Sequence, residues 1–556
     1  MRFKTKMNYK YGIALDIGTS GIRAQALDLK TSQVISTAIT LRHPLPGANV
    51  VDHLHFAIEV GRETTHKLLL DAINKVIKSL NIDLNNVTRV AVCGNSIQLS
   101  LFHNIEIRDL AYWGQHALDR LKVTPPQRDA TITTPEKVGL EVNAKAEIYI
   151  PPAIKHEIGA DALAMLFKAD ILEKKGIFLV SDFGTNAEIA LIINGEVYTC
   201  SAAAGPAIEG QMIEKGRLAS PGTICDLELT NYGWKTHILD DNLLTQEGDE
   251  VDPSTGKIIS HKENSAKSIG ITGTGVIAAF SLGLDNGLIT LPKIKSPDHQ
   301  IHLQDDTYLT EKDIVNIGKA LGAFRAAYLT LAEEAGVLLE DIDATFMAGA
   351  SGFYVDPLKS LNVGQIPPSS QEIYQMGNTS LAMARDLIID PSLLDKLQSM
   401  AKGMRSKHIM LATSSIFEKI YSLELSIYEQ GMPFWMYNEW LNKYGFQKVA
   451  PRSFNPQIHR IFERDIPELG KEGLHITKVG SILEAEFEGC TNCKTCLDHC
   501  PENAITIENG LIKVRTDLCS GMGCLKCALS CPNKVFKYGK LLSSEEIKAA
   551  QAETDL

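Results

Sequence analysis

The sequence lacks the surplus of basic residues that nucleic-acid binding requires, with 55 Lys and Arg against 67 Asp and Glu and a formal net charge of −12. A protein that follows nucleic-acid phosphates normally carries a basic surface, so this class is disfavoured. No stretch approaches about 18 uninterrupted apolar residues, and no apolar core follows the basic N-terminal segment. We therefore expect a cytoplasmic protein with no membrane span, no secretory signal and no nucleic-acid partner.

Cysteine is nearly absent from the first 489 residues, where only Cys93, Cys200 and Cys225 occur. A secreted disulfide scaffold would spread its cysteines along a small chain, so that class is excluded. We expect the three to be buried small hydrophobic side chains in a reducing compartment. The other eight of the 11 cysteines lie between Cys490 and Cys531, a concentration typical of metal ligands.

The remaining composition is that of a packed protein of several domains. The chain has 556 residues, of which 44% are hydrophobic and 22% charged, and its length predicts about three to five domains. Apolar residues at helical spacing predict helices over 57–80, 311–335 and 408–429. From 443 to 478 the chain is polar, with prolines at 451, 456 and 467, which predicts a loosely packed linker.

The pattern Asp-x-Gly-Thr occurs twice, at Asp16 and again 166 residues later at Asp182. Each copy lies between two apolar runs, which predicts a strand, a tight turn and a second strand. After the second copy, Asn194-Gly195 predicts another hairpin turn and a third strand. Two similar half-domains that each begin with this hairpin would explain the repeat.

Both hairpins offer the chemistry of a phosphate-binding loop. Glycines let the backbone approach a ligand, hydroxyl groups add donors, and successive backbone N–H groups form an anion site. Each aspartate ends a strand, where a carboxylate can hold a hydrated magnesium ion. A single copy is more often an ordinary glycine hairpin, but two copies in the same order favour a clamp on nucleotide phosphates. The candidate residues are Asp16, Gly18, Thr19, Ser20 and Gly21 in the first copy and Asp182, Gly184, Thr185 and Asn186 in the second.

Three glycine-rich turns follow, at 201–210, 270–280 and 348–357. Such turns accept phosphates at helix starts or let an adenosine ring pack on the backbone, although each alone is more often structural. No G-x-x-x-x-G-K-[ST] occurs, which excludes a P-loop, and the polar segment before 270 argues against a Rossmann strand. The candidate nucleotide contacts are Gly205, Gly273, Gly275, Gly349 and Gly352.

The clustered cysteines form two tandem runs, C-x2-C-x2-C-x3-C-P from 490 and C-x4-C-x2-C-x3-C-P from 519. The first matches the bacterial ferredoxin run, in which three cysteines hold one 4Fe–4S cluster and the fourth crosses to the other. Zinc sites use paired Cys-x2-Cys knuckles without this repeated tail, so iron–sulfur is favoured. The expected ligands are Cys490, Cys493, Cys496 and Cys531 for cluster one, and Cys519, Cys524, Cys527 and Cys500 for cluster two.

The segment between the two cysteine runs, AITIENGLIKV, predicts two strands joined by an Asn509-Gly510 turn. The second run also contains two extra residues within 520–523. Such an insertion could alter the exposure or the potential of the second cluster.

The two hairpins and the AGASG turn resemble the acetate and sugar kinase, heat-shock protein and actin superfamily. More closely, DFGTNAEIAL at 182–191, SAAAGPAIEG and GITGTG resemble the reductive activators of corrinoid proteins, over roughly residues 10–430. Phe183 and Ala187 replace the isoleucine and glycine of many members. The C-terminal two-cluster domain is similar to the branch of activators that serves methylamine methyltransferases of methanogenic archaea.

This resemblance implies a two-lobed α/β actin-like ATPase body followed by a small α+β ferredoxin domain with two 4Fe–4S clusters. It implies reduction of an inactive Co(II) corrinoid protein to Co(I), using ATP with Mg²⁺ and a low-potential electron donor, with Asp16 and Asp182 as catalytic residues. The domains it implies are a first ATPase lobe at 1–175, a second lobe at 176–385, closing helices at 386–442, a linker at 443–482 and the ferredoxin domain with its tail at 483–556.

Three other functions fit parts of the sequence. An activator of a radical enzyme, of the 2-hydroxyacyl-CoA dehydratase type, shares the ATPase fold but bridges a single cluster between subunits. A small-molecule kinase with a regulatory cluster domain would transfer phosphate to a sugar or an acid. A scaffold that binds nucleotide and docks a ferredoxin would show no ATP turnover.

Overall fold

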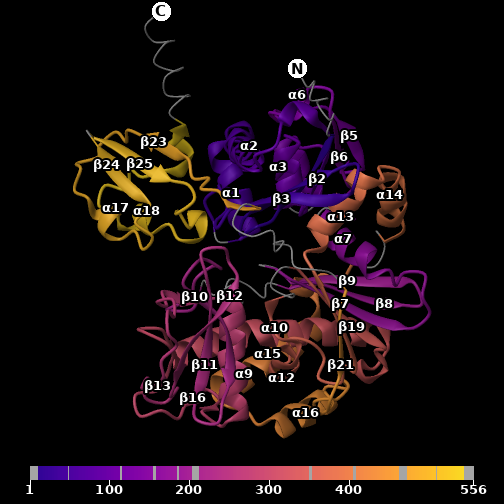
Figure 1. Cartoon of the computed structure of the whole chain (residues 1–556), viewed down its shortest axis with the longest axis vertical. Helices are drawn as coiled ribbons and strands as arrows, with labels where there is room; N and C mark the ends of the chain where they lie inside the picture. Colours follow the sequence, from indigo (N-terminus) through magenta and orange to yellow (C-terminus); the bar gives the residue numbers. More distant parts are fainter. Residues whose placement is uncertain are drawn as a thin grey trace, which may run out of the picture. The chain divides into compact units, whose positions relative to one another are not determined.

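The computed structural model describes most of the chain, and these residues form two compact units (Figure 1). Unit 1 comprises residues 1–161, 383–401 and 467–556, and unit 2 comprises residues 162–382 and 402–466. The chain therefore passes between the units more than once, and the domain boundaries expected from the sequence stay a prediction. The described residues are 10–47, 49–112, 115–154, 158–184, 187–202, 212–349, 354–404, 408–461, 473–508 and 510–543.

The body of unit 1 is a mixed sheet in the order β22-β3-β2-β1-β4-β6-β5. Strands β1, β2 and β3 form an antiparallel meander, and β4 and β6 continue the sheet parallel to β1. Strand β1 has the sequence YGIALDI, and almost all of it is buried because the strand lies inside the sheet. The strands are β1 (Tyr11–Ile17), β2 (Ile22–Asp28), β3 (Gln33–Ile39), β4 (Val87–Gly94), β5 (Thr131–Thr133), β6 (Glu147–Ile150) and β22 (Leu474–Ile476).

Helices α1 and α2 replace the single helix predicted over 57–80. Helix α1 begins at the Asn49 cap, whose side chain accepts the N–H of Asp52, and Gly61 with a φ of 104° separates it from α2. Helix α2 contacts strands β2 and β3. The helices of this unit, with the larger parts of α13 and α14, are α1 (Val50–Val60), α2 (Arg62–Ser79), η1 (Leu84–Asn86), α3 (Ser96–Phe102), α4 (Arg108–Ala111), α5 (Gln115–Leu121), α6 (Pro135–Val138), α13 (Thr379–Ile389) and α14 (Leu393–Met404).

Unit 2 repeats this architecture in a sheet of order β21-β20-β19-β7-β8-β9. Strands β7, β8 and β9 form the antiparallel meander, and β19, β20 and β21 continue it in parallel, as β4 and β6 do in unit 1. The predicted duplication is therefore confirmed. The predicted Asn194-Gly195 turn is confirmed as well, since both of its residues have positive φ. The strands are β7 (Ile177–Phe183), β8 (Ala187–Ile193), β9 (Glu196–Ala202), β19 (Ala344–Ala348), β20 (Glu372–Gly377) and β21 (Gln457–Arg460).

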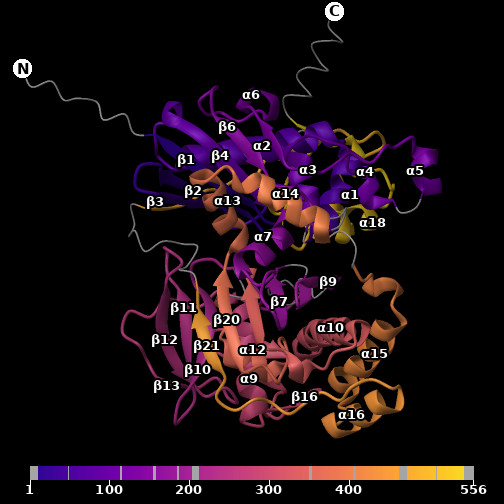
Figure 2. The same cartoon turned by 90° about the vertical axis from the view of Figure 1, so that its right-hand side faces the viewer.

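A second sheet in unit 2 has the order β13-β12-β11-β10-β14, and Figure 2 labels its strands β10 to β13. Two short hairpins pair β15 with β16 and β17 with β18. Their bounds are β10 (Thr223–Leu229), β11 (Trp234–Leu239), β12 (Thr245–Val251), β13 (Ile258–Ser260), β14 (Gly270–Ile271), β15 (Ile289–Thr290), β16 (Lys293–Ile294), β17 (Gln300–His302) and β18 (Tyr308–Thr310).

Two of the predicted helices lie in unit 2. Helix α10 spans the predicted residues 311–335, because Thr310 and Asp313 form a capping box at its start and Gly336 at a φ of 69° ends it. The helix predicted from 408 begins only at 415, since the Ser414 side chain caps it by accepting the N–H of Phe417. The helices are α7 (Ala160–Ala169), α9 (Gly273–Asp285), α10 (Glu311–Ala335), η2 (Leu339–Asp341), α12 (Pro357–Val363), η3 (Leu411–Thr413), α15 (Ser415–Gln430) and α16 (Phe434–Lys443).

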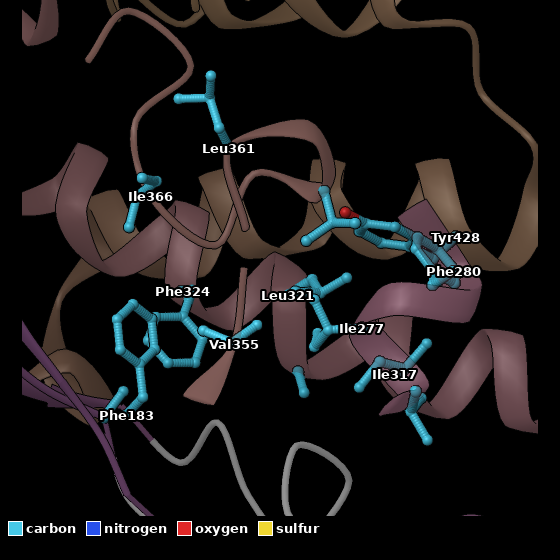
Figure 3. Packing of buried hydrophobic residues seen from close by; sticks show 14 of the residues in the cluster. Phe183, Ile277, Phe280, Ile317, Leu321, Phe324, Val355, Leu361, Ile366 and Tyr428 are labelled. Atoms are coloured by element: carbon cyan, nitrogen blue, oxygen red, sulfur yellow. The ribbon is translucent and has the colours of Figure 1, made fainter. Parts of the chain in front are cut away.

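The core of unit 2 lies where α9, α10 and α15 pack together against the meander of β7, β8 and β9 (Figure 3). Phe183 at the end of β7 meets Phe324 of α10, with ring centroids 5.3 Å apart. On α10, Gly318 leaves the room that Tyr428 of α15 occupies, because a Cβ there would overlap the Tyr428 ring. The buried Glu424 of α15 lies beside the guanidinium of Arg325, with Nη1 to Oε2 at 3.5 Å.

The prediction of a loosely packed linker over 443–478 is wrong in the described parts, because this segment adds an edge strand to the sheet of β1–β3 and another to the sheet of β7–β9. Strand β21 pairs in parallel with β20 of unit 2, where His459 stacks on Tyr374 with ring centroids 4.5 Å apart. Strand β22 pairs in parallel with β3 of unit 1, from Leu474 opposite Thr37. Polar composition and prolines do not exclude edge strands, since an edge needs ladder hydrogen bonds on one side only.

Candidate functional site

The first phosphate hairpin is formed by the end of β1 and the start of β2. Asp16 lies opposite Arg23 in the ladder and is 6% exposed, with its Oδ2 3.8 Å from Arg23 Nη1. The turn is closed by the N–H of Gly18, which donates to the carbonyl of Gly21 at 3.0 Å. A Cβ at Gly21 would lie 2.9 Å from the Thr40 carbonyl, so only glycine fits between the two hairpin strands and the end of β3.

Asn95 joins this hairpin from the neighbouring strand, and the sequence interpretation missed it. Its side-chain N–H donates to Thr19 Oγ1 at 3.4 Å. Its carbonyl oxygen accepts the N–H groups of Ile97 and Gln98, at 3.1 and 2.9 Å, and so caps α3. An Asn directly after an apolar strand and before a helix is the usual cap signal, and this pattern could have identified the residue.

The second phosphate hairpin lies at the end of β7, where Asp182 faces Glu188 across the ladder. The neighbouring strand β19 places Ala348 beside Asp182 and then continues into Gly349. Gly349 has a φ of 80°, and a Cβ there would overlap the Asp182 carboxylate. Two predicted positions, Asp182 and Gly349, are therefore neighbours. Position 349 must be glycine because of its positive φ and because a Cβ has no room beside the Asp182 carboxylate.

The other predicted nucleotide contacts are placed only in part. Gly273 begins α9, and Gly275 packs against β10, since a Cβ there would lie 2.6 Å from the Ile224 carbonyl. Thr272 caps this helix by accepting the N–H of Gly275 at 3.2 Å, so Gly275 has a structural role in the described chain. Gly184 follows β7, whereas four predicted residues lie outside the described ones, namely Thr185, Asn186, Gly205 and Gly352.

The ferredoxin domain of unit 1 is a sheet of order β24-β25-β23-β26 with two short helices. The predicted hairpin between the cysteine runs is present as β24 and β25; Asn509 is outside the described residues, and Gly510 has a φ of 85°. The elements are β23 (Ile482–Ala485), α17 (Thr495–Asp498), β24 (Ile505–Glu508), β25 (Leu511–Arg515), η4 (Gly521–Gly523), α18 (Lys526–Ser530), η5 (Tyr538–Lys540) and β26 (Leu542–Ser543).

Four cysteines from both runs line one cavity in this domain, together with apolar side chains that include Ile507 and Phe536. Cys493 is exposed and its Sγ lies 3.2 Å from Thr495 Oγ1, which lowers the pKa of that thiol. Burial raises the pKa of the third thiol of the first run, Cys496. The cavity cysteines are Cys490, Cys493, Cys496 and Cys531.

The other four cysteines, Cys500, Cys519, Cys524 and Cys527, also lie near one another. Cys519 interacts electrostatically with Cys500 and Cys524, and Cys527 with Cys519 and Cys500. The buried Tyr538 hydroxyl lies 2.8 Å from Cys519 Sγ. Burial raises the pKa of the Cys527 thiol to about 12, so a cation or a cluster is needed to keep it as a thiolate.

Backbone N–H groups point at sulfur atoms in this second group. The N–H of Ala504 donates to Cys500 Sγ at 3.3 Å, and the N–H of Gly521 donates to Cys519 Sγ at 3.4 Å. N–H···S bonds of this kind tune the potential of iron–sulfur clusters. Among the residues that the structure describes, no three His, Cys, Asp or Glu side chains converge as the ligands of one metal ion do. A cluster has no such requirement, because each thiolate binds a different iron atom.

The extra residues of the second cysteine run contact the sheet body of unit 1. The N–H of Gly47 donates to the carbonyl of Cys519 at 3.0 Å. Gly521 has a φ of 62°, and a Cβ there would lie 3.0 Å from the Pro46 carbonyl. Helix α1 contacts both η4 and η5. The loop that we expected to alter the exposure of the second cluster is therefore the one that docks on the body.

The three scattered cysteines belong to strands outside the ferredoxin domain, namely β4, β9 and β10. Cys93 and Cys200 are buried, as predicted, and Cys225 is half-buried with its Sγ 3.4 Å from the His237 carbonyl. Burial raises the pKa of the Cys200 thiol well above its ordinary value, so this thiol is unreactive. No helix within the described ranges is long and apolar enough to cross a membrane.

Comparison with known proteins assigns each of these parts. Residues 11–174 match the family description "RACo middle region", residues 176–438 match "C-terminal domain of RACo the ASKHA domain", and residues 482–551 match "4Fe-4S dicluster domain". The chain is 46% identical over 500 residues, 89% of its length and 92% of the relative's, to the "[Co(II) methylated amine-specific corrinoid protein] reductase" of Methanosarcina barkeri.

Two further proteins are more distant. The "Corrinoid activation enzyme RamQ" of Eubacterium limosum is 23% identical over 74% of this chain and 70% of that protein. The solved structure of a "Reductive activator for corrinoid,iron-sulfur protein" shares the fold with a TM-score of 0.62 at 22% identity, over 76% of this chain and 66% of that one, just under two thirds of its length. The chain belongs to the family of reductive activators of corrinoid proteins, with an actin-like ATPase body followed by an iron–sulfur ferredoxin domain.

Proposed function

We propose that this protein reduces the Co(II) form of a methylated amine-specific corrinoid protein to Co(I), in a one-electron step that depends on ATP. The observation that carries the proposal is the union, in one chain, of a duplicated actin-like ATPase body with a ferredoxin domain, at 46% identity to a reductase of such a corrinoid protein. The cobalt belongs to the partner protein and is the substrate. Electrons enter from a low-potential donor, and methylamine-dependent methanogenesis is the metabolism that this acceptor implies.

The ferredoxin domain would hold two 4Fe–4S clusters, which supply one-electron transfer when they are bound. The first would be bound by the four cysteines that line one cavity, and the second by the four that interact around Cys519. In this division Cys500 and Cys531, the last cysteine of each run, each join the three cysteines of the other run. This is the arrangement of bacterial two-cluster ferredoxins, which supports the division. The protein's own contribution is the set of N–H and O–H groups that point at the sulfur atoms, since these stabilise the more negative reduced state.

The two hairpins would bind ATP with Mg²⁺. The N–H groups of the first turn other than that of Gly18 are suited to phosphate oxygens, and Asp16 is placed to hold Mg²⁺ through water. Asp182, fixed beside Gly349, is the second carboxylate suited to Mg²⁺ or to the attacking water. A supply of free energy is needed because each 100 mV of uphill electron transfer costs about 2.3 kcal/mol.

The test is to mix the anaerobic protein with the Co(II) corrinoid protein, a low-potential reductant and ATP, and to follow Co(I) by absorbance. Co(I) should accumulate with ATP and not with ADP. Asp16→Asn and Asp182→Asn should each slow this reaction on the order of 100-fold, because each removes one carboxylate charge from the phosphate site. Both variants should keep the iron and sulfide content of the wild type, about eight of each per chain. Wild-type rates in both variants would exclude the carboxylates from the ATP site.

A further inference from the structure

Two buried histidines lie directly under the loop on which the ferredoxin domain docks. His43 and His53 stack with ring centroids 4.1 Å apart and 21° between their planes, and they are 5% and 0% exposed. Neither Nε2 atom has a hydrogen-bond partner among the residues that the structure describes. An apolar pair would fill the same space without an unmet polar atom, so packing alone does not explain these two residues.

One side of the histidine pair leads to the phosphate hairpin. His53 Nδ1 lies 2.8 Å from Nε2 of Gln98, which is fully buried in the first turn of α3. Burial lowers the pKa of His53 to about 3, so the ring is neutral and its Nδ1 accepts the amide N–H. The side-chain oxygen of Asn95 caps the same turn by accepting the N–H of Gln98, and the side-chain N–H of Asn95 donates to Thr19.

The other side of the pair leads to the second cysteine group. His43 Nδ1 accepts the N–H of Leu45 at 3.1 Å, which fixes the turn before Gly47. A Cβ at Gly47 would lie 2.9 Å from Cδ2 of His53, so this backbone rests on the ring. The N–H of Gly47 then donates to the carbonyl of Cys519 at 3.0 Å.

We propose that Asn95, Gln98, His53 and His43 are positioning residues that couple nucleotide binding at the Thr19 hairpin to the loop of Cys519, and hence to the potential of the second cluster. The inference rests on the proposed function, because it assigns the route by which ATP acts on electron transfer. Thr19 is the hairpin residue that a phosphate would displace, and Asn95 must follow it. Gln98, His53 and His43 are close-packed and buried. A displacement of Asn95 therefore meets no free space along this route and is passed on to the backbone at Gly47.

The coupling is measured as a nucleotide-induced shift in midpoint potential, followed by electron paramagnetic resonance on the full-length protein with both clusters. In the wild type, ATP with Mg²⁺ should shift the potential of the second cluster and leave that of the first unchanged. Gln98→Leu should remove at least half of this shift while ATP binding, measured by calorimetry, stays within about twofold. Gln25→Leu is the matched control, because Gln25 is a buried glutamine of the same unit that lies off this route.

A second variant covers the case in which Gln98→Leu fails to fold. Asn95→Ser keeps a capping oxygen for α3 but is too short to reach Thr19, so it should lose the shift with little loss of stability. A wild-type protein without a nucleotide-induced shift, or a full shift in the folded variants, would overturn the coupling. The proposed function would survive either result if Co(I) still formed with ATP. Failure of the wild type to form Co(I) with ATP would instead reject the proposed function.

Discussion

Replacing Tyr538 by phenylalanine should lower the midpoint potential of the second cluster. The Tyr538 hydroxyl lies 2.8 Å from Cys519 Sγ, and the tyrosine is 6% exposed. A cluster-bound thiolate carries no proton, so the hydroxyl must be the donor. Burial raises the pKa of Tyr538 far above its ordinary value, and the hydroxyl therefore keeps its proton. Reduction adds negative charge, so the loss of this donor disfavours the reduced state and makes the potential more negative.

The size of the effect follows from the charge that one thiolate gains. A hydrogen bond to a charged group contributes about 1.5–3 kcal/mol to stability. One added electron is shared among four iron–thiolate corners, so about a quarter of this value depends on the redox state. The resulting 0.4–0.8 kcal/mol, approximately, corresponds to a shift of about 15–35 mV at 2.3 kcal/mol per 100 mV.

The assay is an anaerobic redox titration followed by electron paramagnetic resonance, with both clusters present. Tyr149→Phe is the matched control, because Tyr149 is also buried, and its hydroxyl donates to Glu147, in the sheet body. An unchanged potential, a positive shift, or a shift confined to the cluster of the first cavity would refute the assignment of Cys519 and its donor.

Three further predictions concern the body of the protein. Gly349→Ala should reduce ATP-dependent activation on the order of 100-fold with both clusters retained, because the new Cβ displaces the Asp182 carboxylate; normal rates would contradict this geometry. Glu424→Gln should lower the free energy of unfolding of unit 2 by about 3–5 kcal/mol, measured by urea denaturation, because it leaves the buried Arg325 charge uncompensated; a change within 1 kcal/mol, roughly, would show that the pair is dispensable. Between pH 7.5 and 5.5, unit 1 should lose about 1.4 kcal/mol through His53, whose pKa falls from 6.5 unfolded to about 3 folded, so the stability is present above pH 6.5 and is lost as the pH falls; His53→Phe should remove this part of the pH dependence of urea denaturation.

The duplicated hairpins and the ferredoxin halves could be predicted because their signals are local. Gly21 and Gly349 serve close approaches that only glycine permits, and the Thr310–Asp313 capping box defines the start of α10 within four residues of sequence. The spacing of the cysteine runs likewise fixes which thiols share a cavity once the crossing rule is applied.

The contacts that the sequence did not predict join segments far apart in the chain. Leu474 pairs with β3, more than 400 residues earlier, and nothing in its polar surroundings indicates a partner strand. The apolar spacing continues on both sides of Gly61 and therefore predicts one long helix, and only the backbone conformation of Gly61 separates α1 from α2. The sequence around His43 and His53 likewise gives no sign that the two rings stack, because their role depends on contacts with Gln98 and with the docked loop.

The strand β22 limits how far the ferredoxin domain can travel. After the strand, Thr477 is still tied to the body, by its N–H to the Ile39 carbonyl and by its hydroxyl to Ser79 Oγ at 2.6 Å. Ser481 is already bound within the ferredoxin domain, through Thr516. Only residues 478–480 connect these two anchor points, and even fully extended they span about 10–14 Å. A domain on so short a connection cannot carry electrons between distant sites, so the proposed function requires the corrinoid protein and the electron donor each to bind where the domain already lies.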